Sequence, residues 1–134
     1  MRSTRIVTSF IKNNEKILIL KRSDKVKSMK GLWSGISGII ENNEKPSDRA
    51  KIEILEEIGI KREKITLIKY LEKITIRSPQ YKNHEWEVFS FLFETKETKI
   101  KLNWENSQFK WINIYELKNY ETVPNLEKIL LDLW

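Results

Sequence analysis

Three glutamates, Glu53, Glu56 and Glu57, stand at spacings i, i+3 and i+4 in this chain of 134 residues. On a helix, these spacings place the side chains on one side, one above the other. Three negative charges this close together are costly unless a cation or protons neutralise them. Carboxylate oxygens suit hard cations such as Mg²⁺, which keeps several waters and bridges to substrate phosphates. The spacing therefore predicts a magnesium–phosphate site.

The glutamates belong to a longer pattern, GIIENNEKPSDRAKIEILEEIGI, which runs from Gly38 to Ile60. It resembles the signature of the Nudix hydrolases, G-x5-E-x7-R-E-U-x-E-E-x-G-U, in which U is a bulky aliphatic residue. Every position with a required residue type matches except one, because Ile52 stands where the family has arginine. The preceding WSGISG, which begins at Trp33, is similar to the family's frequent W-x-x-P-G-G, with isoleucine and serine in place of the proline and the first glycine.

The resemblance implies roles for the matched residues. Glu53, Glu56 and Glu57 would be the catalytic acids that coordinate one or more Mg²⁺ ions, with Mn²⁺ as a possible substitute. The carbonyl oxygen of Gly38 would be a further ligand. Such metals neutralise a pyrophosphate, stabilise the leaving group and lower the pKa of a bound water. Glu44 is expected to tie the loop to the helix, and the general base stays open between a glutamate of the signature and an acid in a later loop.

Ile52 is the departure that matters for this chemistry, because the family's arginine pairs with the carboxylates and Ile52 has nothing to donate. Arg49 lies four residues before Glu53 on the same helical side, so we expect it to supply the missing charge. An alternative is that Ile52 joins an apolar stripe next to Leu55. A weakened site, in a protein that only binds a nucleotide, is a further alternative, but the retained carboxylates favour an active enzyme.

The remaining pattern predicts a mixed α/β fold, since apolar, β-branched runs predict strands and polar stretches predict turns. The expected strands are Arg5–Lys12, Lys16–Arg22, Ile36–Ile40, Ile65–Ile76, Glu85–Phe93 and Gln108–Ile112. The expected helical segments are one that opens at Pro46 or Ser47, a short turn at Ile114–Leu117 and a final helix at Pro124–Trp134. This order suits a sheet covered by helices. The resemblance implies the Nudix fold, a mixed β-sheet sandwiched between helices (α/β/α).

The helix that carries the glutamates is expected to end at Gly59, because proline suits the first turn and glycine the C-terminal cap. The carboxylates should border an apolar stripe that packs on the sheet. We expect this stripe to consist of Ala50, Ile54, Leu55 and Ile58.

Length and composition agree with a single domain over residues 1–134, and the resemblance implies that it is a Nudix hydrolase domain. With 40% hydrophobic and 33% charged residues, the chain has the composition of a globular protein. It contains no cysteine, which excludes disulfides and thiolate metal sites. The sequence lacks a run of about 18 apolar residues and an N-terminal signal-peptide pattern, so we predict a cytoplasmic protein that is not in a membrane. A monomer and a homodimer both stay open.

The charge balance favours a polyanionic partner. The chain has 25 Lys+Arg against 19 Asp+Glu, a formal net charge of +6. A nucleotide-type small molecule satisfies this balance as well as nucleic acid does, and no nucleic-acid-binding motif is present. A polar loop, 23–31, and the residues before it are crowded with basic side chains, namely Lys21, Arg22, Lys25, Lys27 and Lys30.

Substrate recognition must come from outside the signature. We expect Lys27 and Lys30 to contact phosphate oxygens, although a solvated basic loop is an equal alternative. Tyr81 and Trp104 lie in loop-like stretches and are candidates for stacking on a base. The single histidine, His84, has no second histidine nearby to form a metal site. Four acids outside the signature are candidates for an extra ligand or base, or else are solvated charges: Glu85, Glu87, Glu94 and Glu97.

Two function classes follow from these observations. The first is Mg²⁺-dependent hydrolysis of a phosphoanhydride bond in a nucleoside diphosphate linked to another moiety. The second is a catalytically weakened Nudix-fold module that binds a nucleotide or an RNA end. Phrases outside the signature, such as WEVFSFLFE and TVPNLEKIL, are similar to a group of archaeal Nudix proteins of undefined substrate.

Overall fold

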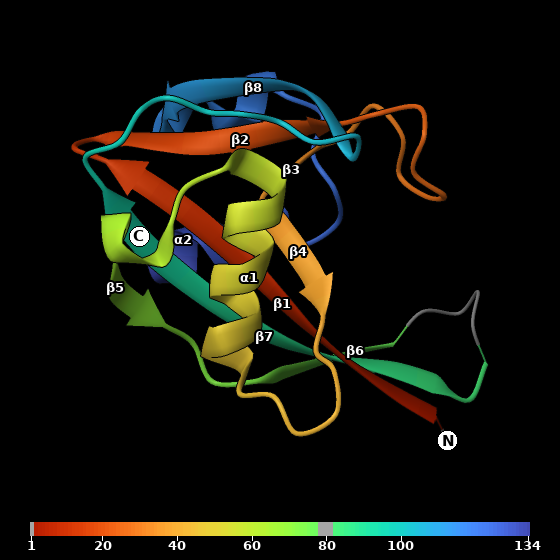
Figure 1. The fold of residues 1–134 in the computed structure, drawn as a ribbon. Coiled ribbons are helices and arrows are strands. Elements are labelled where there is room, and N and C mark those ends of the chain that lie inside the picture. The colour runs from red at the N-terminus through yellow and green to blue at the C-terminus, as the bar shows by residue number, and fades with distance from the viewer. Residues whose placement is uncertain (1, 78–81) are drawn as a thin grey trace.

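The computed structural model describes residues 2–77 and 82–134 (Figure 1). Its strands are β1 (Arg2–Asn13), β2 (Lys16–Arg22), β3 (Trp33–Ser34), β4 (Ile36–Ile39), β5 (Ile65–Tyr70), β6 (Ile74–Arg77), β7 (His84–Thr95) and β8 (Asn106–Asn113). Its α-helices are α1 (Pro46–Ile58) and α2 (Leu126–Leu133), and its 3-10 helices are η1 (Arg62–Lys64) and η2 (Ile114–Asn119). In the described part of the chain, no helix is long and apolar enough to cross a membrane.

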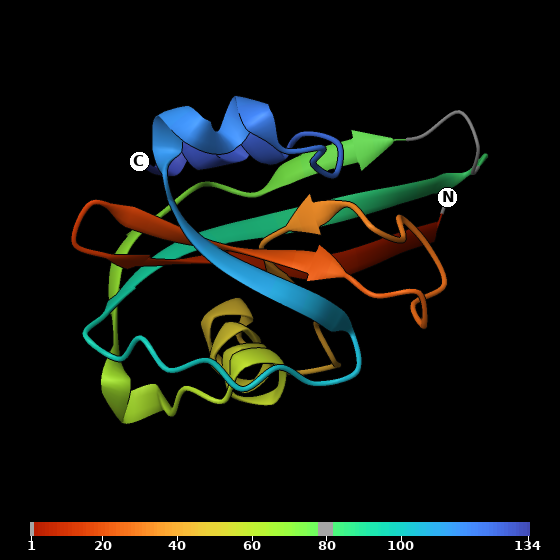
Figure 2. The same cartoon turned by 90° about the horizontal axis from the view of Figure 1, so that it is seen from above.

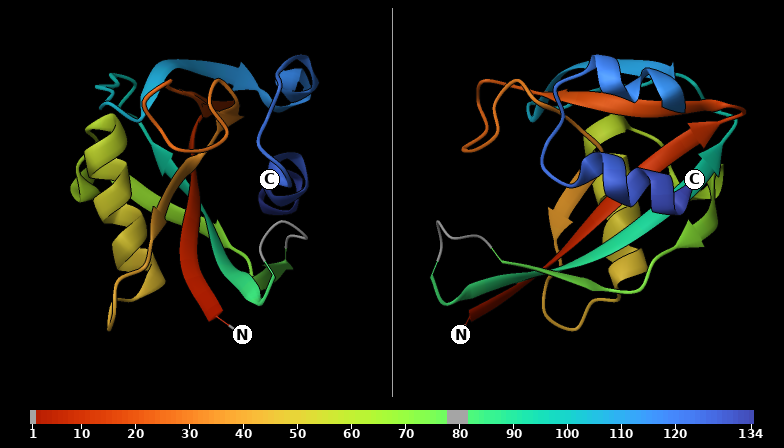
Figure 3. Two further views of the ribbon diagram at one scale, coloured as in Figure 1. Left: turned by 90° about the vertical axis from the view of Figure 1, so that its right-hand side faces the viewer. Right: turned by 180° about the vertical axis from the view of Figure 1, so that it is seen from behind.

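The strands form one mixed sheet with the order β3-β2-β1-β7-β5. β1 runs parallel to β7, from Arg2 opposite His84 to Lys12 opposite Glu94. The other pairings are antiparallel, with β4 on β1, β8 on β2 and β6 on β7. α1 covers one face of the sheet, and α2 and η2 cover the other (Figures 2 and 3). The predicted α/β/α sandwich is confirmed.

The two faces of the sheet bury separate cores, because successive side chains of a strand point to opposite faces. Ile11 and Phe93 lie in the cluster beneath α1. Their chain neighbours Phe10 and Leu92 lie in the cluster beneath α2 and η2. All four side chains are almost completely buried. The pair β1–β7 thus separates the two cores and lies between the two helical layers.

α1 begins at Pro46, ends at Ile58 and is capped by Gly59, as predicted. Gly59 has φ 74°, in the left-handed region that favours glycine, and its N–H donates to the carbonyl oxygen of Leu55. Leu55 was expected in the buried stripe, but its side chain is 49% exposed, so that prediction is wrong. The stripe that packs on the sheet consists of Ala50, Ile54 and Ile58, with Glu53 and Glu57 buried beside it.

The structure differs from the predicted elements in several places. The run Ile65–Ile76 is not one strand but β5 and β6, since the chain leaves the ladder at 71–73 while both pieces pair with the long β7. The final helix begins at Leu126 rather than Pro124, because Asn125 before it has φ 70° and a left-handed backbone. The short strand β3, which pairs with β2, was not predicted.

Candidate metal centre

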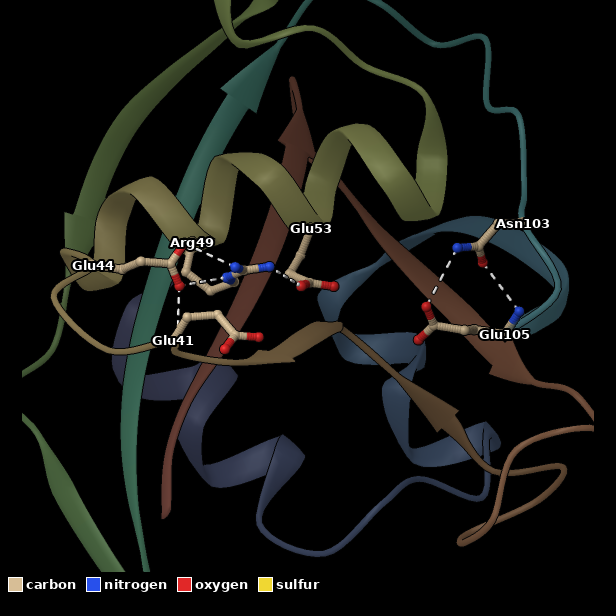
Figure 4. A network of polar contacts seen from close by, with 6 residues as sticks. All are labelled: Glu41, Glu44, Arg49, Glu53, Asn103 and Glu105. Atoms are coloured by element: carbon tan, nitrogen blue, oxygen red, sulfur yellow. Dashed lines mark hydrogen bonds and ion pairs between the residues drawn. The ribbon is translucent and has the colours of Figure 1, made fainter. Parts of the chain in front are cut away.

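Carboxylates from two segments far apart in the sequence meet beside α1. Glu53 and Glu57 come from α1, and Glu105 comes from the loop before β8; one oxygen of each lies within 4.8 Å of the others. Figure 4 shows Glu53 and Glu105 on the same side of α1. Glu53 and Glu57 are buried, and Glu105 is half-buried. Oxygen ligands at this spacing have the chemistry that hard divalent cations prefer.

Glu57 is the most buried of the three acids, with 3% of its surface exposed. Its Oε1 accepts a hydrogen bond of 3.2 Å from Nδ2 of Asn106. Its Oε2 is buried and accepts no well-formed hydrogen bond from the described residues, although the backbone N–H of Ser37 lies close enough to this carboxyl group to lower its pKa. A buried polar atom without a partner is costly. A cation bound by this oxygen would remove that cost, so the donor set fits a metal ion.

Burial also changes the protonation of these acids. Loss of solvent raises the pKa of Glu57 to about 9, the negative charge of Glu105 adds to the effect, and the bond from Asn106 opposes it. The pKa of Glu53 is also raised, mainly by burial, while Arg49 opposes the rise. Without a cation, Glu57 therefore keeps its proton at neutral pH, and a bound divalent ion would have to displace that proton.

Arg49 links the first acid of the signature to the second. Its Nη2 and Nε donate to Oε2 and Oε1 of Glu44 at 2.8 and 3.0 Å, and its Nη1 donates to Oε2 of Glu53 at 3.0 Å (Figure 4). Glu44 Oε1 also accepts the backbone N–H of Glu41 at 2.6 Å. Bonding to both glutamates raises the pKa of Arg49, so the guanidinium stays charged. These contacts hold the loop before α1 against the helix.

Gly38 lies in β4, opposite Val7 of β1. A Cβ atom at position 38 would overlap the carboxyl group of Glu53. Glycine is needed here for close approach rather than for backbone conformation. Its missing side chain leaves the space that the Glu53 carboxylate occupies at the edge of the sheet.

The loop that carries Glu105 is fixed at several points. The N–H of Lys101 donates to the carbonyl oxygen of Ile58, at the C-terminal end of α1, at 3.0 Å. The Asn103 side chain accepts the N–H of Glu105 at 3.0 Å and donates to its Oε1 at 3.3 Å. Asn106 follows as a buried residue at the start of β8. The loop thus delivers Glu105 and the partner of Glu57 together.

The other residues of the signature lie at or outside the edge of this group. Glu56 is exposed and is not one of the three clustered carboxylates, although its charge contributes to the raised pKa of Glu53. Ile52 is 37% exposed, on a flank of α1 away from the buried acids. It therefore does not form part of the buried stripe, and that alternative is wrong.

The basic loop begins next to the carboxylates. The N–H of Ser23 donates to the carbonyl oxygen of Glu105 at 2.8 Å, and its hydroxyl donates to the carbonyl oxygen of Trp104 at 2.7 Å. Lys27 and Lys30 are exposed in this loop, and the Trp104 side chain is 60% exposed. All three are accessible to a ligand. Tyr81, the other candidate for stacking, lies outside the described residues.

The structure brings none of the four acids proposed outside the signature into the carboxylate group. Glu85 and Glu87 of β7, for example, pair with Arg77 of β6 and with Lys73 directly before β6. The acid that joins the group, Glu105, was missed. The sequence held one signal for it, an acid at the end of the charged connection directly before a strand. Glu97 Oε1 accepts the backbone N–H of Lys99 at 3.0 Å, and His84 is bonded to the Thr4 hydroxyl at 2.7 Å.

Comparison with known structures shows many chains of similar fold. The MutT Nudix hydrolase from Burkholderia pseudomallei is 19% identical, with a TM-score of 0.77 and 100% of each chain covered. A Caenorhabditis elegans Ap4A hydrolase, solved as a binary complex, is 15% identical, with a TM-score of 0.73 and coverage of 98% of this chain and 93% of that one. The Nudix domain of Shewanella oneidensis NrtR, solved with ADP ribose, is 12% identical, with a TM-score of 0.76 and coverage of 98% and 86%.

These identities show a shared fold alone, and a search of curated proteins finds no match. The family comparison goes further. The model of the NUDIX domain matches residues 2–133, which is nearly the whole chain. The match includes the complete stretch from Gly38 to Ile60 and the loop that carries Glu105. The chain therefore belongs to the Nudix hydrolase family.

Proposed function

We propose that this chain is a divalent-metal-dependent pyrophosphohydrolase, acting as one domain over residues 1–134. In the proposed reaction, water adds to a phosphorus atom of a nucleoside diphosphate linked to another moiety. The phosphoanhydride bond breaks, and a nucleoside monophosphate and the phosphorylated remainder leave. The observation that supports this proposal best is the unpartnered Oε2 of Glu57, which lies in a group of three carboxylates.

We infer that the ion is Mg²⁺, with Mn²⁺ as a substitute, and that Glu53, Glu57 and Glu105 hold it. A bound ion of this kind neutralises pyrophosphate charge and lowers the pKa of a bound water. Glu56, exposed beside the group, is proposed as a further catalytic acid, and the backbone of Gly38 as a further ligand. Residues that hold these acids in place are Glu44, Arg49 and Gly59.

A nucleotide-type substrate is supported by two structures of similar fold and by the net charge of the chain. Two proteins of similar fold are an Ap4A hydrolase and a domain solved with ADP ribose, and in both compounds phosphoanhydrides join a nucleoside to a second group. The net charge of +6 favours such an anion. We propose that Lys27 and Lys30 contact its phosphates and that Trp104 stacks on its base. Tyr81 stays a second candidate for stacking.

A substrate panel tests the reaction directly. Purified protein with Mg²⁺ would be incubated with nucleoside triphosphates, dinucleotides, nucleotide sugars and capped RNA, and the products identified by chromatography. We expect a nucleoside monophosphate from at least one linked diphosphate and no turnover in excess chelator. Nucleotide binding without hydrolysis of any compound, with Mg²⁺ or Mn²⁺, would instead identify a binding module.

The basic loop is tested by kinetics. We expect the double variant Lys27→Ala/Lys30→Ala to raise KM more than it lowers kcat, because lost phosphate contacts weaken binding before they affect chemistry. Higher ionic strength should act in the same direction. Lys118→Ala/Lys128→Ala, on η2 and α2, removes the same charge elsewhere and is the matched control. Equal kinetics in the two double variants would show that the loop lysines are only solvated surface.

A further inference from the structure

Two asparagine side chains each donate a hydrogen bond to one oxygen of a clustered carboxylate. Asn106 Nδ2 donates to Oε1 of Glu57 at 3.2 Å, and Oε2 of the same carboxylate has no partner among the described residues. Asn103 Nδ2 donates to Oε1 of Glu105 at 3.3 Å, and no described residue donates to its Oε2. In each pair, a neutral amide fixes one oxygen and leaves the other available.

The third carboxylate is held in the same way by a different donor. Arg49 Nη1 donates to Oε2 of Glu53 at 3.0 Å, and none of the described residues donates to Oε1. Arg49 carries a positive charge, but the negative charge of Glu44, to which it makes two hydrogen bonds, offsets it. The donors therefore orient the three carboxylates without removing the negative charge that a cation requires.

We propose that Asn103, Asn106 and Arg49 are positioning residues that make the three carboxylates present one oxygen each to a single divalent ion. This inference rests on the proposed function, because it assumes that the group binds a metal. Three single oxygens leave the other positions of an octahedral ion to waters and substrate phosphates, which is the arrangement that Mg²⁺ prefers. Ca²⁺ takes six to eight oxygens and often uses carboxylates in bidentate fashion. Carboxylates that have one oxygen engaged in a hydrogen bond, and so offer only the other to the ion, therefore favour Mg²⁺ and Mn²⁺ over Ca²⁺.

The first part of the proposal is that the positioned carboxylates bind a single ion. Mn²⁺ binding, measured by calorimetry and electron paramagnetic resonance without substrate, tests it. We expect one ion per chain in the wild type and an affinity about 10- to 100-fold weaker in Asn106→Ala, the effect typical of lost partners around metal ligands. Asn103→Ala should weaken binding less, because its bond is longer and its side chain only half-buried. Two ions bound per chain at this stage, or wild-type affinity in both variants, would overturn the proposal.

Asn13→Ala is the matched control, because Asn13 Nδ2 donates to the backbone carbonyl of Thr95 at 2.8 Å, far from the acids in the sequence. A purely structural asparagine lowers the melting temperature without changing the metal affinity of the folded protein. We expect that pattern for Asn13→Ala and not for the two site variants. If Asn106→Ala does not fold, Asn103→Ala still decides the question.

The second part of the proposal is that the positioned carboxylates prefer Mg²⁺ and Mn²⁺ to Ca²⁺, and ion selectivity tests it. The ratio of the Mn²⁺ to the Ca²⁺ affinity should fall in Asn106→Ala and Asn103→Ala, because freed carboxylates can turn to bind Ca²⁺ with both oxygens. An unchanged ratio in both variants would overturn the inference on orientation. A wild type that binds no Mn²⁺ would overturn the proposed metal-dependent function itself. A wild type that binds Mn²⁺ and hydrolyses substrate, with variants of equal affinity, would remove only the role of the asparagines.

Discussion

The two flanks of α1 contain neighbouring residues with opposite environments. On the inner flank, Glu53 and Glu57 are buried against β4 and the loop before β8. On the outer flank, Ile52 and Leu55 are exposed and line a surface hollow of about 620 Å³ together with residues of η1. Most helices bury apolar side chains and expose charged ones. Here two acids are buried instead, and each accepts one hydrogen bond, Glu53 from Arg49 and Glu57 from Asn106. We therefore expect the inner flank to serve ligand binding rather than stability.

The largest expected difference between the flanks concerns turnover. Glu57→Gln removes an anionic ligand and should lower kcat/KM by about 100-fold or more, because metal binding and charge stabilisation are lost together. Leu55→Gln, two residues away on the outer flank, should leave kcat/KM unchanged. Steady-state kinetics on both variants would measure this difference in kcat/KM, and circular dichroism would check that both variants are folded. Similar losses in the two variants would contradict the distinction between the flanks.

Arg49→Ala should have the next largest effect. It removes three hydrogen bonds to Glu44 and Glu53, and we expect kcat to fall about 10- to 100-fold together with the Mn²⁺ affinity. Arg49→Lys should recover only part of this loss, since an ammonium group cannot reproduce the planar fork of a guanidinium. Lys51→Ala on the same helix is the control for a lost positive charge. Full activity in Arg49→Ala would show that Glu53 keeps its position without it.

The buried acid also predicts how stability depends on pH. In chelator, the folded-state pKa of Glu57 is about 9 against an ordinary value of 4.5, so the folded state binds the proton more tightly. The stability from this proton is fully present below pH 4.5 and is lost as pH rises toward 9, with a slope of at most about 1.4 kcal/mol per pH unit. Urea unfolding between pH 6 and 8.5 should show a flatter profile for Glu57→Gln. Glu56→Gln should follow the wild type, and parallel profiles for all three proteins would exclude this effect.

The smallest effect is expected from Ile52→Arg, which restores the residue of the family signature. Because position 52 is exposed, the free energy of unfolding should change by no more than about 0.5 kcal/mol. An arginine there lies four residues before Glu56 rather than Glu53, so it should not rescue Arg49→Ala. A double-mutant cycle on kcat would measure this. Rescue by Ile52→Arg would show that both positions serve the same carboxylates.

The local part of the site was predictable from the sequence. The spacing of Glu53 and Glu57 is fixed by the helix period, and Gly59 marks the end of that helix. The position of Glu105 was not predictable, because it depends on the path of a connection with no regular structure. The bond between Asn106 and Glu57 joins residues 49 positions apart, and no periodicity in the sequence encodes it.

The fold shows the same division between local and distant information. Apolar, β-branched runs predicted most strands, and the family resemblance supplied their arrangement. The gap between β5 and β6 was missed because residues 71–73 contain neither glycine nor proline. The exposure of Leu55 was missed because the width of a buried stripe depends on how the helix is seated on the sheet, which is a tertiary property.

During synthesis, β1 is made well before its parallel neighbour β7, which follows only after residue 83. Pairings between such distant segments require the closure of a long loop and fold slowly. Glu105 and Asn106 are made later still, so a nascent chain that ends before residue 100 already carries the α1 acids without their later partners. During synthesis, the carboxylate group can therefore be completed only after residue 105 has been made. A released fragment of this length would also lack β8, so the edge of β2 that pairs with β8 would be open to aggregation.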